Sequence, residues 1–106
     1  MSNGRKTKEI KRIRNEALVA LRVLYPASIQ ADRLFRSLLV LFPTLEFDHF
    51  RRDLHYLCDK GYVMRVTPDG EDDPVLTPWR RRWFRLTTSG IELADRCISD
   101  PALDES

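Results

Sequence analysis

The stretch FDHFRRDLHYLCDKGYV, residues 47–63, decides the fold of this chain of 106 residues. Apolar residues recur in it at spacings of three, four and three, at Phe47, Phe50, Leu54 and Leu57. This spacing places the four side chains on one face of a helix and leaves polar residues on the other face. Gly61 predicts the end of the helix, because a residue without a Cβ readily adopts the left-handed conformation. The next residues, 62–67, predict a strand.

Two further helices are expected before this stretch. The first runs over about residues 7–25 and carries an apolar stripe formed by Ile10, Ile13, Ala17, Leu21 and Leu24. After a short extended segment at 27–30, rows of leucine and phenylalanine predict a second helix over about 31–42. A proline directly follows each of the two helices and ends it. Thr44 is a candidate N-cap for the third helix.

The second half of the chain predicts a hairpin and a last helix. A turn-rich segment separates the strand at 62–67 from a second strand at 79–86. The period of two in that strand sends Phe84 and Leu86 to one face, and Trp79, Arg81, Trp83 and Arg85 to the other. Thr87 or Ser89 then caps a helix that continues to about Ser99.

Length and composition indicate one globular domain over residues 7–99, with a disordered basic tail at 1–6 and an acidic disordered tail at 100–106. The longest apolar run, 38–42, is five residues and does not span a membrane. The N-terminus has no apolar segment typical of a secretion signal. The two cysteines, Cys58 and Cys97, lie far apart and favour a reduced, cytoplasmic protein.

Charge is distributed unevenly along the chain. The formal net charge is only +2, but basic residues are concentrated in the first helix and at 80–85. Acidic residues are concentrated in the segment 69–73, which contains Asp69, Glu71, Asp72 and Asp73, and in the C-terminal tail. Such polarity can place a basic surface against an anionic partner.

The order of elements resembles the winged helix-turn-helix domain, an α+β fold of three helices, a two-stranded wing hairpin and a C-terminal helix. Two stretches carry the resemblance. The first is Arg52-Asp53-Leu54 with Leu57 and Lys60-Gly61-Tyr62-Val63, which is similar to a recognition helix entering a wing strand. The second is Phe84-Arg85-Leu86-Thr87 followed by Gly90 and Leu93, an ending found in MarR, PadR and ArsR-type regulators. A looser resemblance is to small winged-helix proteins of Mu-like phages and prophages.

The resemblance implies a transcriptional regulator that binds double-stranded DNA without a cofactor. Helix 45–60 would occupy the major groove, and the hairpin 62–87 would contact the backbone. The residues implied on the helix are His49, Arg51, Arg52, His55 and Tyr56. Those implied on the phosphates are Arg80, Arg81 and Arg82 from the hairpin and Lys8, Lys11 and Arg12 from the first helix. Relatives of this type also imply a homodimer through the first or last helix.

Other features favour a different interpretation. Glu46 and Asp48 lie where a base-reading helix approaches the groove, and the expected wing is acidic. The alternative is therefore a protein-interaction or scaffold module that does not bind DNA, using the apolar part of the first helix or the Trp79–Trp83 face. In that face, Trp79, Arg81, Trp83 and Arg85 would form a cation–π ladder.

The sequence gives little support to an enzyme or a metal centre. His49, His55, Cys58 and Cys97 have no paired Cys-x-x-Cys spacing, so we assign no metal. No serine or cysteine lies in a recognisable nucleophile turn, and no glycine-rich phosphate loop is present in the sequence. We therefore predict a binding protein, not a catalyst.

Overall fold

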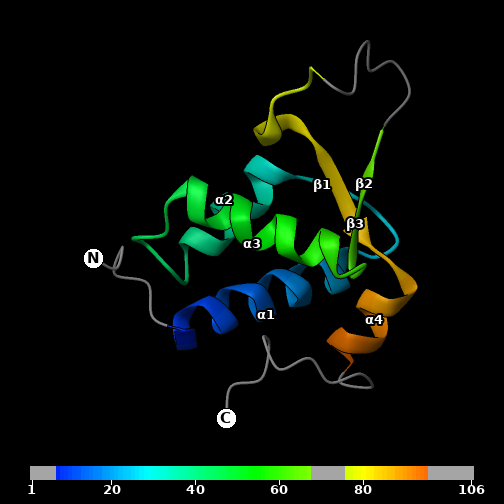
Figure 1. The fold of residues 1–106 in the computed structure, drawn as a ribbon, viewed down its shortest axis with the longest axis horizontal. Helices are drawn as coiled ribbons and strands as arrows, with labels where there is room; N and C mark the ends of the chain where they lie inside the picture. Colours follow the sequence, from blue (N-terminus) through cyan, green and yellow to red (C-terminus); the bar gives the residue numbers. More distant parts are fainter. Residues whose placement is uncertain (1–6, 68–75, 96–106) are drawn as a thin grey trace.

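The computed structural model describes residues 7–67 and 76–95, which form an α+β domain (Figure 1). Its elements are α1 (Thr7–Leu24), β1 (Ile29–Gln30), α2 (Ala31–Leu39), α3 (Phe47–Asp59), β2 (Val63–Val66), the 3₁₀ helix η1 (Trp79–Arg81), β3 (Trp83–Leu86) and α4 (Thr88–Ala94). The two predicted tails, the acidic segment 69–73 and the predicted extension of the last helix to Ser99 lie outside the described residues.

The first and third helices agree with the sequence prediction to within two residues at each end. The second helix is three residues shorter than predicted and ends at Leu39. Its last turn tightens there, because the backbone N–H groups of Leu41 and Phe42 both donate to the carbonyl of Leu38. The predicted N-cap Thr44 is wrong, because α3 begins after Glu46 and no side chain caps it.

The sheet has three antiparallel strands in the order β1-β3-β2, where the sequence predicted a two-stranded hairpin. The short extended segment before α2 supplies the third strand. Ile29 lies opposite Phe84, and Val63 lies opposite Leu86 on the other side of β3. Pairing on both edges of β3 therefore ties the start of α2 to the end of α3 through one central strand.

The predicted strand over 79–86 is wrong in its first half. Residues 79–81 form η1, and β3 begins only at Trp83. Pro78 has a φ of −58°, and its carbonyl accepts the N–H of Arg81 while the carbonyl of Trp79 accepts the N–H of Arg82. This turn removes Trp79 and Arg81 from the strand, so the predicted cation–π ladder along one strand face does not form.

The start of α4 is fixed to the end of α3. The hydroxyl of Thr87 accepts the N–H of Gly90 and donates to the carbonyl of Gly61, so Thr87 is the N-cap, as one of the two predicted alternatives. Gly61 has a φ of +81°, in agreement with the predicted helix stop. A Cβ at Gly90 would collide with the backbone carbonyl of Tyr62.

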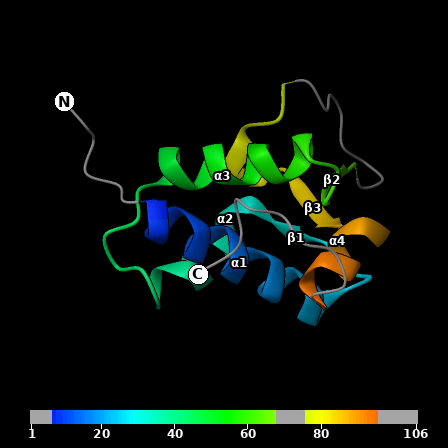
Figure 2. The same cartoon turned by 60° about the horizontal axis from the view of Figure 1, so that its bottom comes forward.

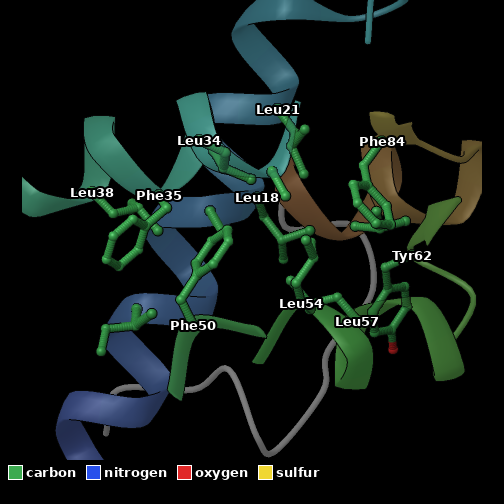
Figure 3. Packing of buried hydrophobic residues seen from close by; sticks show 14 of the residues in the cluster. Leu18, Leu21, Leu34, Phe35, Leu38, Phe50, Leu54, Leu57, Tyr62 and Phe84 are labelled. Carbon is green, nitrogen blue, oxygen red and sulfur yellow. The ribbon is translucent and has the colours of Figure 1, made fainter. Parts of the chain in front are cut away.

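One apolar core joins all four helices to the sheet. Figure 3 shows α3 contributing Phe50, Leu54 and Leu57 to the same cluster as residues of the other elements, Leu18, Leu21, Leu34, Phe35, Leu38, Tyr62 and Phe84. These side chains are between 0 and 9% exposed. Burial of each large apolar side chain stabilises the fold by about 1.5–3 kcal/mol. The face of α3 that carries them is therefore fixed toward the core.

We predict that Gly90→Ala lowers the free energy of unfolding by about 3 kcal/mol, because a buried methyl group in contact with backbone cannot be accommodated by a side-chain rotation. Urea denaturation followed by circular dichroism measures the loss. Ser89→Ala, at an exposed position of the same helical turn, is the matched control and should change stability by less than about 0.5 kcal/mol. Equal stability of the two variants would contradict the close packing of α4 on the end of α3.

Candidate nucleic-acid interface

Helix α3 presents one continuous polar surface, because its apolar residues all point to the core. In Figure 2 it lies along one edge of the described domain, with α1 and α2 on its inner side. The exposed side chains on the opposite side recur at spacings of four, three and four, at Asp48, Arg52, His55 and Asp59. We call these four residues the outer face of α3. Their spacing keeps them in one row along the helix.

One border of the outer face is made with α1. Asp53 is only 2% exposed, and its carboxylate accepts a hydrogen bond from Nε of Arg14 at 3.2 Å. The same guanidinium lies 3.8 Å from the centre of the Tyr56 ring. Tyr56 is half-buried beneath Arg14, so it lies on this border beside the outer face. The half-buried His49 lies one turn before Asp53 on this border.

The opposite border is made with η1. The guanidinium of Arg80 lies 4.1 Å from the ring centre of Phe47, at the start of α3. One helical turn before the end of α3, the rings of His55 and Trp79 are 6.3 Å apart. Through these two contacts, η1 lies beside α3. The arginine-rich segment identified in the sequence therefore lies next to the outer face, although it does so from a turn and not from a strand.

An arginine patch lies where η1 meets α2. Arg36 and Arg80 both bind the carboxylate of Asp32, at 3.1 and 3.0 Å, and Arg81 is the exposed neighbour of Arg80. We call Arg36, Arg80 and Arg81 the arginine patch. Because one carboxylate is shared by two guanidinium groups, the patch keeps a positive charge. Sequence inspection missed Arg36, since only the ion pairs with Asp32 bring it next to Arg80.

Arg82 has a structural role that the sequence did not indicate. Its Nε donates to the carbonyl of Thr77 at 2.9 Å, and its guanidinium lies 5.1 Å from the ring centre of Trp79. The Trp79 ring is in turn stacked on Phe84 at 5.4 Å. Arg82, which the resemblance placed on a phosphate, is therefore half-buried against Trp79. Its side chain holds η1 against the sheet.

The outer face combines positive and negative groups. Arg51 is 3.9 Å from Asp48, and Nδ1 of His55 is 3.2 Å from Asp59. Among residues 7–67 and 76–95, Arg52 makes no ion pair. Arg51, Arg52 and His55 line a surface hollow of about 340 Å³. The outer face as a whole can therefore both donate and accept hydrogen bonds.

The basic residues predicted on the first helix differ in their surroundings. Arg12 covers the ring of Phe42 at 5.1 Å, and Lys8 is exposed. Lys11 is one turn before Arg14 on the same face of α1. The N-terminal ends of α1 and α3 lie on the same side of the molecule (Figure 1), and Arg14 of α1 contacts Tyr56 of α3. Cations therefore flank α3 from two elements.

Other chemistry has little support at this surface. Burial, with a smaller contribution from the neighbouring Asp59, raises the pKa of the Cys58 thiol to about 11, so the thiol is neutral at pH 7. Within the described ranges, no three His, Cys, Asp or Glu side chains gather as a metal site would require. No helix in those ranges is long and apolar enough to cross a membrane.

Comparisons with protein-family models, with curated proteins and with solved structures found no match. What this surface can bind therefore has to follow from its own charges, exposure and shape. The surface is formed by α3, whose outer face carries both acidic and basic side chains. Helix α1 lies on one side of α3 and η1 on the other, and cations lie along both borders.

We predict that Arg14→Met lowers the free energy of unfolding by about 3 kcal/mol, because it removes the charge of the Arg14 guanidinium from the buried carboxylate of Asp53. Arg22→Met is the control on the same helix. Arg22 pairs with Asp95 at 3.1 Å, but both side chains are more than 40% exposed, so this loss should stay below about 1 kcal/mol. Chemical denaturation of the two variants measures the difference. Similar losses would mean that the Arg14–Asp53 pair does not anchor α3.

Proposed function

We propose that this domain is a winged helix-turn-helix protein that binds double-stranded DNA through the outer face of α3. The observation that carries the proposal is the exposed outer face of α3 with cations on both sides of it. A helix with its side chains is about 10–12 Å wide, which matches a major groove about 12 Å wide. Cations on either side of such a helix would face the two phosphate strands that border the groove.

The order of elements supports the same proposal. Helix α2, a turn and helix α3 are followed by β2 and β3, in the order in which a helix-turn-helix unit precedes its wing. The third strand, β1, leads directly into α2 and pairs with β3. Helix α3 would then be the recognition helix, as the winged-helix resemblance implies.

The charged groups divide into two classes under this proposal. Arg81 and the exposed part of Arg80 would contact phosphates from the η1 side, and Lys8 and Lys11 would do so from α1. The outer face would then meet the edges of the bases. A regulator of transcription is the role that best fits such a protein, because it requires discrimination between DNA sequences.

We predict that a fluorescent duplex of random sequence binds this protein and loses about a hundredfold in affinity between 50 and 200 mM salt, as expected for about four phosphate contacts. Arg81→Ala should weaken binding to all duplexes alike and reduce the salt dependence by about one phosphate contact. Arg22→Ala removes the same charge at the far end of α1 and is the control. Fluorescence anisotropy measures all three proteins. Absence of binding at 50 mM salt would refute the proposal.

A second candidate function is an interaction module that pairs with another protein or with a second copy of this chain. Val19 and Val23 lie one turn apart on α1, and they are 44 and 78% exposed. The Trp79–Trp83 face is a weaker candidate than the sequence implied, because Trp79 packs against the core and stacks on Phe84. The exposed valines of α1 therefore favour this helix as the contact surface.

If α1 forms a homodimer, sedimentation equilibrium at micromolar concentration should give a mass twice that of one chain, whose mass is 12.5 kDa. Val23→Lys should then restore the monomer, because a charge replaces an exposed apolar side chain at the interface centre. Thr88→Lys, at an exposed position on α4, is the matched control. A wild-type protein that remains monomeric would exclude the homodimer through α1.

A further inference from the structure

The first two residues of the outer face, Asp48 and Arg52, differ in what they can recognise. Asp48 and Arg52 are four residues apart and exposed, and the Asp48 side chain is 77% exposed. The row of α3 that faces α1 contains the buried Asp53, and Phe47 is covered by Arg80 on the side of η1. Asp48 and Arg52 therefore lie on the exposed side of the first half of α3, the half of a recognition helix that meets the base edges in a groove.

We infer that Asp48 and Arg52 read a cytosine and a guanine in the major groove, an inference that rests on the proposed DNA binding. A carboxylate only accepts hydrogen bonds, and the cytosine N4 amino group is the donor that Asp side chains recognise in this groove. The guanidinium of Arg52 only donates, and guanine O6 and N7 form the acceptor pair that arginine binds in a bidentate manner.

The spacing of Asp48 and Arg52 along α3 fits two bases that lie one or two base-pair steps apart. Four residues of an α-helix span about 6 Å, and successive base pairs are about 3.4 Å apart. The two side chains can thus reach bases one or two steps apart. Arg52 is available for this contact, since it makes no ion pair with the residues that the structure describes. Within the described part of the chain, the cation paired with Asp48 is Arg51, at the long distance of 3.9 Å.

Asp48 carries a negative charge on the helix that would enter the groove, which by itself disfavours DNA binding. The carboxylate of Asp48 repels phosphates and therefore weakens binding to any duplex that offers it no amino group. At a cytosine the same carboxylate gains a hydrogen bond. Asp48 would thus contribute to specificity by lowering the affinity for wrong sequences as well as by raising it for the right one.

Selection of binders from a random duplex library, followed by anisotropy on the selected site and on single-base variants, tests the inference. The selected site should contain a guanine and a cytosine that lie one or two base-pair steps apart. Arg52→Ala should reduce the preference for guanine about tenfold. Asp48→Ala should reduce the preference for cytosine about tenfold, and it should bind random duplex more tightly than the wild-type protein does.

Glu92→Ala, which removes an exposed acid from α4, is the control and should change no base preference. Circular dichroism of each variant checks its fold. If Asp48→Ala and Arg52→Ala keep the base preferences of the wild-type protein, or the selected site lacks either base, the assignment is wrong while DNA binding stands. If no duplex binds at low salt, the proposed function fails together with the assignment.

Discussion

The buried ion pair between Arg14 and Asp53 is the constraint on which the arrangement of α3 depends. Apolar packing alone holds Phe50, Leu54 and Leu57 in the core, but a hydrophobic contact tolerates small rotations of a helix. A charged pair with a hydrogen bond of 3.2 Å is directional. Because Asp53 is buried on α3, the outer face is held at a fixed rotation, away from α1. The Arg14–Tyr56 contact reinforces this rotation.

The opposite side of α3 is held by a second arginine, Arg80. Arg80 combines an ion pair to Asp32 with stacking on Phe47, so one guanidinium connects η1, the first turn of α2 and the start of α3. Arg82 and Trp79 then join η1 to the sheet. The arginine-rich segment thus has two roles. Arg80 and Arg82 position η1 and the start of α3, and the exposed part of Arg80 together with Arg81 keeps a cationic border beside α3.

Local periodicity was enough to predict the helices but not their contacts. The spacings of apolar residues located α1 and α3 closely, and Gly61 marked the end of α3, because these signals depend on neighbours in the chain. The burial of Asp53 could not be predicted, since its partner lies 39 positions away and nothing in the local pattern distinguishes it from a solvated acid. The same limit hid the approach of Arg80 to Asp32 beside Arg36, and the pairing of β1 with β3.

The η1 turn shows a second limit. Alternation from Trp79 to Leu86 is a sound strand signal, yet Pro78 imposes a 3₁₀ turn at its start and changes which arginines are exposed. Among the candidate site residues, Arg52, His55 and Arg81 are exposed. Tyr56 and Arg82 are half-buried, against Arg14 and Trp79 respectively. Side-chain exposure in a turn depends on its backbone type, which composition does not determine.

The measurement that tests the central claim most directly is a nuclear magnetic resonance titration of the ¹⁵N-labelled protein with a short duplex. The account predicts that the amide signals of Asp48, Arg52, His55 and Arg81 shift with added DNA, while those around Val23 and on α4 stay in place. Shifts confined to the exposed valines of α1, or no shifts at low salt, would contradict the claim that the outer face of α3 is the DNA-binding surface.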